Sequence, residues 1–104
     1  MLPGIEVILG GTNYLVPPLS LGNLEIFQHR LKTFEGGLDP ASVSTVIDVT
    51  LAAINRNYPD MTRERLGEIM DVSDMADVML AVMDVAGVRR KAAAEEKAKA
   101  SSPP

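Results

Sequence analysis

The spacing of apolar residues divides the chain into one short hairpin and several helices. Two β-type runs, at residues 5–9 and 13–17, flank Gly10 and Gly11. Paired glycines supply the positive φ angles that a tight turn needs, so we expect a β-hairpin over residues 5–17. Because an isolated hairpin is only marginally stable, this one must pack against the helices that follow.

Apolar residues three and four positions apart predict one helix over about residues 20–35 and another over about residues 40–57. Ser20 suits the N-cap of the first helix, and Asp39-Pro40 suits the N-cap and first turn of the second. The residues expected to face the core are Leu21, Leu24, Phe27, Leu31 and Phe34 in the first helix, and Val43, Val46, Ile47, Leu51 and Ile54 in the second. The apolar surface of the second helix is broad, which is typical of a central helix contacted on more than one side.

The stretch from residue 57 to residue 87 predicts two further helices joined by a tight turn. Pro59 should end the preceding helix near Tyr58. Thr62 suits the N-cap of a helix over about residues 62–71, and Ser73 or Asp74 suits the N-cap of a helix over about residues 74–87. The apolar side of the last helix comprises Met75, Val78, Met79, Val82 and Ala86.

The expected fold class is α+β, mainly α, with an N-terminal β-hairpin followed by a small bundle of about four helices. Residues 1–88 should form one globular domain, and residues 89–104 an Ala/Lys/Glu-rich tail that is disordered or helical. Hydrophobic residues make up 46% of the 104 residues, but only 4% are aromatic and there is no Trp. We therefore expect a core of aliphatic residues and the six methionines, which pack adaptably.

The charge distribution limits the classes of partner. The formal net charge is −4, and residues 59–88 hold seven carboxylates against two arginines, whereas residues 89–104 hold five basic against two acidic residues. A net negative charge opposes binding to nucleic acid and to anionic membranes, so we predict neither as a partner. The uncharged run at residues 7–24 is broken by glycines and prolines into pieces too short to span a bilayer.

No residue pattern typical of catalysis, cofactor binding or metal binding is present, so we predict no enzyme activity and no cofactor. The absence of Cys excludes disulfides and thiolate zinc sites. His29 and Glu25 form an i, i+4 pair on a face that looks exposed, with too few ligands for a metal. Asp71, Asp74 and Asp77 lack the spacing of a calcium loop and suit a helix cap and first turn.

Two interpretations of the helix–turn–helix unit at residues 62–87 remain open. One is a DNA-binding regulator, which the acidic second helix disfavours because it contains no Lys, Arg, Asn or Gln. The other is an apolar surface for a protein partner or for a homo-oligomer. The candidate partner-binding residues are Met75, Met79, Val82 and Met83. Met75 and Met79 also suit the core, whereas Met83 lies off the apolar stripe and is expected to be exposed.

Three stretches in this order carry a family resemblance: IEVILGGTNYLVPPLSLGNLEIF, then NYPDMTRERLGEIMDVSDMADVMLAVMDVAGV, then the basic, Ala-rich tail. The chain resembles the tail assembly chaperones of long-tailed bacteriophages. The resemblance implies a non-structural protein of the infected host cell's cytoplasm that is absent from the mature virion. It would bind the tape-measure protein, keep it soluble and help to recruit tail-tube subunits. The family supplies no catalytic residue, and in many members a frameshift yields a longer second form.

Overall fold

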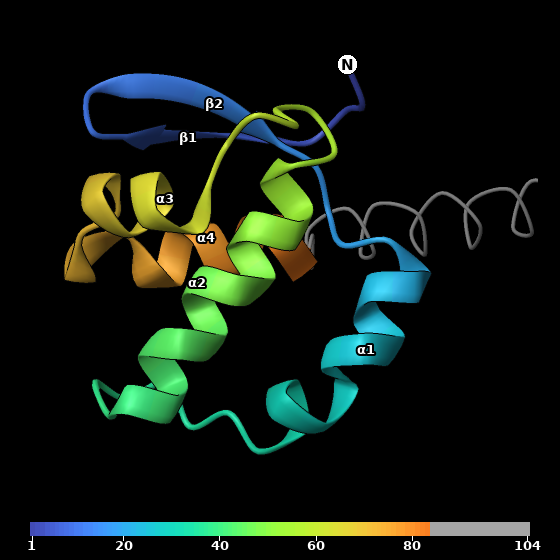
Figure 1. Cartoon of the computed structure of the whole chain (residues 1–104), viewed down its shortest axis with the longest axis vertical. Helices are drawn as coiled ribbons and strands as arrows, with labels where there is room; N and C mark the ends of the chain where they lie inside the picture. The colour runs from blue at the N-terminus through green and yellow to red at the C-terminus, as the bar shows by residue number, and fades with distance from the viewer. Residues whose placement is uncertain (84–104) are drawn as a thin grey trace, which may run out of the picture.

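The structure is a computed structural model that describes residues 1–83; the predicted end of the last helix, at 84–87, and the tail at 89–104 lie outside the described residues. Two strands, β1 (Ile5–Leu9) and β2 (Thr12–Val16), are followed by α1 (Leu21–Lys32), α2 (Pro40–Ile54), α3 (Arg63–Ile69), the 3-10 turn η1 (Val72–Asp74) and α4 (Met75–Met83). The predicted hairpin followed by four helices is confirmed. The hairpin lies across one end of the helices, and α2 runs through their middle (Figure 1).

The hairpin is antiparallel and closes through a two-residue turn. Leu9 pairs with Thr12, and Val7 pairs with Tyr14. Gly10 and Gly11 have φ angles of 57° and 79°, which glycine adopts without the steric cost that a Cβ imposes. A Cβ on Gly10 would also lie 3.0 Å from the side chain of Ile69, so this glycine lets the turn approach α3 closely.

Side-chain caps begin α1, α2 and α3 at the predicted residues. The caps are Ser20, Asp39 and Thr62, and their side-chain oxygens accept hydrogen bonds of 3.1 Å from the backbone amides of Asn23, Ser42 and Arg65. These bonds satisfy amides that a helix start otherwise leaves without partners. Three helices end earlier than predicted, α1 at Lys32, α2 at Ile54 and α3 at Ile69.

The segment after α2 holds the hairpin in place. The side-chain amide of Asn57 donates to the backbone oxygens of Leu2 and Leu15, both at 2.9 Å, and accepts from the Leu2 amide at 2.7 Å. The Tyr58 hydroxyl accepts from the Leu15 amide at 2.9 Å, and its ring meets Tyr14 edge-on at 5.1 Å. Helix α2 ends before these side chains because the backbone tightens, with the amides of Arg56 and Asn57 donating to the carbonyls three residues earlier, Ala53 and Ile54. We call Asn57 and Tyr58 the hairpin clamp.

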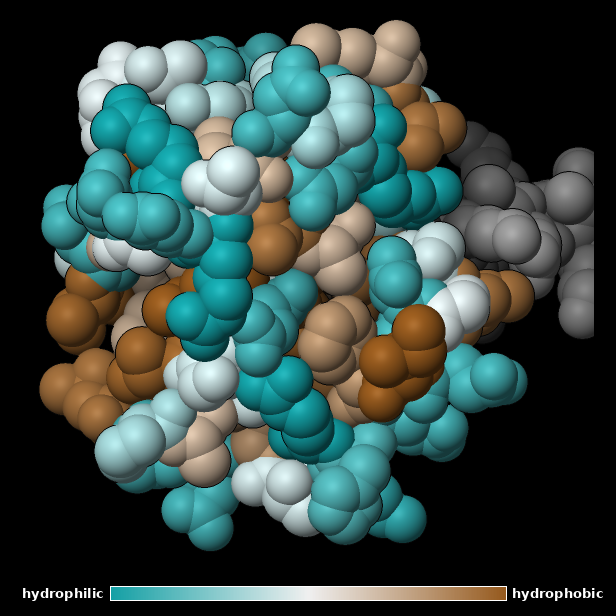
Figure 2. All heavy atoms as spheres, viewed as in Figure 1, coloured by the Kyte–Doolittle hydropathy of each residue, from teal (hydrophilic) through white to brown (hydrophobic). Residues whose placement is uncertain are grey.

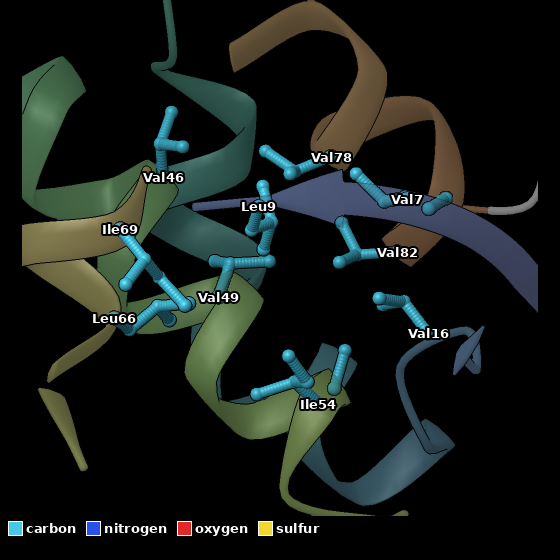
Figure 3. Close-up of a cluster of buried hydrophobic side chains, with 12 residues drawn as sticks. Val7, Leu9, Val16, Val46, Val49, Ile54, Leu66, Ile69, Val78 and Val82 are labelled. Atoms are coloured by element: carbon cyan, nitrogen blue, oxygen red, sulfur yellow. The ribbon is translucent and has the colours of Figure 1, made fainter. Parts of the chain in front are cut away.

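One aliphatic cluster joins the hairpin to α2, α3 and α4 (Figure 3). Its buried members are Val7, Leu9, Val16, Val46, Val49, Ala53, Ile54, Leu66, Ile69, Val78, Ala81 and Val82. The prediction that the methionines help to build this core is wrong. All six lie within the described residues and none is buried; Met61, Met70, Met75 and Met79 pack at the margin of the cluster instead.

The buried face of α2 differs from the one predicted. Val43, Ile47 and Leu51 are only half-buried, although Val46 and Ile54 are buried as expected. The buried residues of the helix are Ser42, Thr45, Val46, Val49, Thr50, Ala53 and Ile54. Most of these side chains are small, so neighbouring helices can approach closely. The helix contacts α1, α3, α4 and β2, which confirms its central position.

Helix α1 lies outside the core cluster, and none of its residues is buried. Phe27, Leu31 and the following Phe34 pack partly against the cluster margin. The prediction for Leu21 is wrong, since this residue is 83% exposed. It begins α1 directly after the chain has left the hairpin, before the helix meets α2. Within residues 1–83, no helix has the length and apolar character needed to cross a membrane.

Candidate functional site

The turn between α3 and α4 shapes the surface around the candidate partner-binding residues. The predicted cap at Ser73 or Asp74 is wrong, because the chain first forms the 3-10 turn η1, and the N-cap of that turn is Asp71. Asp74 instead accepts a hydrogen bond of 2.8 Å from the Asp71 amide, which is the reciprocal half of a capping box. This closed turn leaves the intervening Val72 pointing outward, with 67% of its surface exposed.

Two adjoining apolar hollows surround this turn. The first, of about 120 Å³, lies between α2, the end of α3 and η1, and the second lies between the loop after α1 and the start of α4. Val72 and Met75 line both. We call the joined hollows the apolar trough, defined by Leu38, Val43, Ile47, Val72, Met75 and Met79. Hydrophobic atoms gather at the corresponding left edge of the space-filling view (Figure 2).

The structure separates the four candidate partner-binding residues. Met75 and Met79 are half-buried and line the trough. Val82 is 1% exposed within the core, so it offers no surface to a partner. Met83 is exposed, as its position off the stripe predicts, but it does not line the trough.

Sequence reasoning missed two exposed residues of the trough, Leu38 and Val72. Leu38 is 66% exposed. Each is an isolated large apolar residue in a turn or loop, between glycine and aspartate or between aspartate and serine. This placement was the sequence signal for an exposed apolar residue, because a side chain outside the periodic stripes belongs to no helix face that could bury it.

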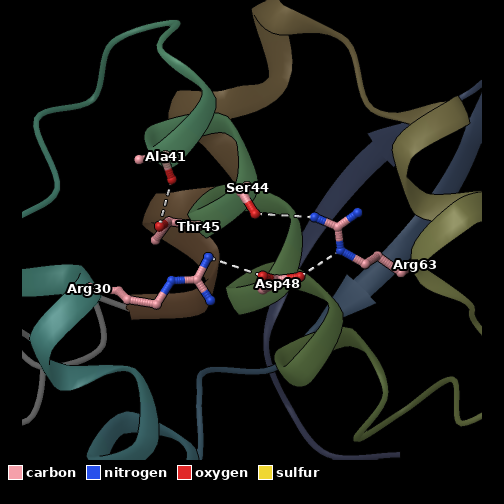
Figure 4. Close-up of polar contacts among 6 residues, drawn as sticks. All are labelled: Arg30, Ala41, Ser44, Thr45, Asp48 and Arg63. Atoms are coloured by element: carbon pink, nitrogen blue, oxygen red, sulfur yellow. Dashed lines mark hydrogen bonds and ion pairs between the residues drawn. The ribbon is translucent and has the colours of Figure 1, made fainter.

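A carboxylate on α2 ties the elements around the trough together (Figure 4). Asp48 accepts from Arg30 of α1 at 3.0 Å and from Arg63 of α3 at 2.7 Å. Arg63 also donates to the Ser44 hydroxyl at 3.3 Å. Partial burial raises the pKa of Asp48, but the hydrogen bonds and charges of Arg63 and Arg30 outweigh it, so the pKa lies below its ordinary value. Asp48 therefore stays ionised and links three helices.

The described residues hold no group of three side chains able to bind a metal ion. His29 and Glu25 are both exposed on α1. The hydroxyl of Thr45 is buried and donates to the Ala41 carbonyl at 2.8 Å, which is a local helix contact. These polar groups therefore have structural explanations.

The outward face of α4 bears on the DNA-binding interpretation. Its exposed residues are Ala76, Asp77, Leu80 and Met83, so its one charged side chain is a carboxylate. A helix that reads the major groove needs cations for phosphates and amides or guanidinium groups for base edges. The described part of α4 has neither.

Comparison with known proteins adds no relative to this picture. No protein-family model, no curated protein sequence and no solved structure matches the chain. The interpretation of the site therefore depends on its own geometry and on the sequence resemblance.

Proposed function

We propose that this protein is a tail assembly chaperone of a long-tailed bacteriophage and that it binds the tape-measure protein through the apolar trough. The observation that carries the proposal is the trough itself. It places the half-buried Met75 and Met79 beside the exposed side chains of Val72 and Leu38. The role is binding, not catalysis.

The chemistry of the trough suits a client with many similar apolar segments. An amphipathic helix docks by laying apolar side chains, three and four positions apart, into an apolar groove. Methionine side chains are unbranched and polarizable, so Met75 and Met79 can adapt to anchors of different shape. Such adaptable surfaces bind several related sequences instead of a single one. The long helical tape-measure protein that the resemblance implies is a client of this kind.

The remainder of the surface suits a protein that keeps its client in solution. The chain carries a formal net charge of −4, and Asp71 borders the trough. Like charges on bound chaperones would keep complexes apart and oppose aggregation. On this proposal the protein acts in the cytoplasm of the infected cell, helps to recruit tail-tube subunits, and leaves before the virion is complete.

The test is co-expression of the tagged full chain with the tape-measure protein encoded by the same phage. We expect the tape-measure protein to become soluble and to copurify in high salt, because apolar contacts are not screened. Val72→Glu and Leu38→Glu should each reduce copurification about tenfold or more, since a charge in the contact must be desolvated. Both side chains are exposed, so the fold should persist.

Matched controls separate the trough from general hydrophobicity. Leu21→Glu and Ile26→Glu place the same charge at exposed apolar positions of α1 and should leave copurification unchanged. Equal losses in all four variants would reject the trough as the binding site. An insoluble tape-measure protein beside abundant, folded wild-type chain would reject the proposed function itself.

A further inference from the structure

A second groove lies along the outer edge of β1, on a different side of α4 from the trough. It is lined by Ile5, Glu6, Val7 and Ile8 of β1 together with Asp74, Asp77 and Leu80 of α4. It shares none of these residues with the apolar trough. The groove therefore runs between one edge of a two-stranded sheet and a helix.

The backbone of β1 offers unused hydrogen-bonding groups to this groove. Leu9 and Thr12 flank a two-residue turn, so they form the first hydrogen-bonded pair of the ladder. Because such pairs alternate, the amides and carbonyls of Glu6 and Ile8 point away from β2. Among residues 1–83, no hydrogen bond connects the backbone of either residue to a group outside the hairpin.

The side chains around the groove combine apolar and acidic character. Ile8 and Leu80 are 67% and 56% exposed, one on the strand and one on the helix. Glu6, Asp74 and Asp77 supply three carboxylates, and none of them takes part in an ion pair within the described chain. A ligand for this groove thus needs apolar side chains, positive charges and free backbone groups.

We propose that the β1 groove binds an extended segment of a partner protein in which apolar residues alternate with Lys or Arg. The segment adds a third strand to the sheet, its backbone pairing with Glu6 and Ile8. Alternate side chains of a strand point to opposite faces, so the apolar ones face α4 and reach Leu80, whereas the basic ones lie on the outer face beside Glu6. A second copy of β1 is a poor occupant because pairing would bring Glu6 and its acidic neighbours against their own kind.

The test uses a ten-residue peptide of alternating Val and Lys, titrated into the isotope-labelled full chain while amide chemical shifts are followed. We expect shifts centred on Glu6 and Ile8, and affinity that falls with added salt. The same peptide N-methylated at alternate residues should bind about tenfold or more weakly, because two or more backbone hydrogen bonds are lost. A Val/Glu peptide should not bind.

Variants of the chain test the same groove from the other side. Asp77→Lys should weaken binding of the Val/Lys peptide, whereas Glu64→Lys, an equal charge change on the exposed side of α3, should not. Ile8→Pro removes an outward amide without removing a hairpin hydrogen bond and should also weaken binding.

Several outcomes would overturn the proposal: unchanged affinity of the N-methylated peptide, chemical shifts at the trough, an equal loss in Glu64→Lys, or self-association through β1. The result is independent of the tape-measure test. Leu38→Glu, designed to disable the trough, should leave binding of the Val/Lys peptide intact.

Discussion

Helix α1 and the rest of the domain show the same apolar periodicity but very different burial. Within residues 1–83, the twelve buried hydrophobic residues of the core come from the hairpin, α2, α3 and α4, and none comes from α1. Helix α1 meets the core margin through half-buried side chains and through the ion pair of Arg30 with Asp48. An apolar stripe therefore predicts that a segment is helical, whereas the depth to which that helix is buried depends on the elements that pack against it.

The largest expected effect lies in the core. Leu66→Ala removes a side chain with no exposed surface and should lower the free energy of unfolding by about 3 kcal/mol, through lost burial and a residual cavity. Urea unfolding followed by far-UV circular dichroism measures this. A loss below about 1 kcal/mol would mean that the core refills easily, which would weaken the contrast with α1.

Phe27→Ala should have a smaller and more local effect. Phe27 is half-buried at the margin of the core, so its removal should cost about 1.5 kcal/mol, half the value of a fully buried aromatic side chain. Native-state hydrogen exchange should show faster exchange in α1 while α2 stays protected. Equal acceleration in both helices would show that α1 unfolds only with the whole domain.

Substitution of a buried polar residue, Thr50, should change the stability in the opposite direction. Thr50 is fully buried, and its hydroxyl has no hydrogen-bond partner among the described residues. Thr50→Val keeps the shape and removes this cost, so the free energy of unfolding should rise by about 1 kcal/mol. Thr45→Val is the matched control, since the Thr45 hydroxyl is paired and its loss should bring no gain. Thermal unfolding of both variants decides the point.

Asp48→Asn tests the polar link between α1 and the core. The pKa of Asp48 is lowered in the folded state, so its contribution is present above the unfolded pKa and is lost as the pH falls through the folded pKa. The pair is partly exposed, and the loss at pH 7 should be about 1 kcal/mol or less. Urea unfolding over a series of pH values from 7 downward should show the largest difference from wild type at pH 7 and a decrease as the carboxyl becomes protonated. A difference that persists in acid would point to packing instead of charge.

The smallest effect is expected on the outer face of α1. Leu21→Gln replaces an exposed side chain by one of similar helix propensity, so the free energy of unfolding should change by less than about 0.5 kcal/mol. Calorimetry of the variant provides the measurement. A large loss would reveal that Leu21 is covered in solution, for example by a second copy.

Local features of the fold were predictable because they depend on neighbouring residues. The caps at Ser20, Asp39 and Thr62 and the Gly10-Gly11 turn are short-range chemistry, and the structure confirms them. The buried face of α2 was not predictable in the same way. Its apolar residues surround much of the helix, so periodicity alone does not say which side α4 will cover.

The candidate site was predictable only in part, for a related reason. Met75 and Met79 lie on the apolar stripe of α4, which places them near the core margin where the trough forms. Val82 shares that stripe but lies deeper, and this difference depends on the packing of α2 and the hairpin against α4. Leu38 and Val72 belong to no stripe, so their contribution to the trough required the tertiary structure.

The hairpin clamp has a consequence for the order of events on the ribosome. The hairpin precedes the clamp along the chain, and Asn57 follows its partners Leu15 and Leu2 by 42 and 55 residues. At synthesis rates of about 5–20 residues per second, Asn57 is added to the chain roughly 2–11 s after the residues whose backbone groups it binds. During that interval the two strands of the nascent chain lack the hydrogen bonds that the hairpin clamp supplies. The contacts between the hairpin and the clamp can therefore form only after α1 and α2 have been synthesised.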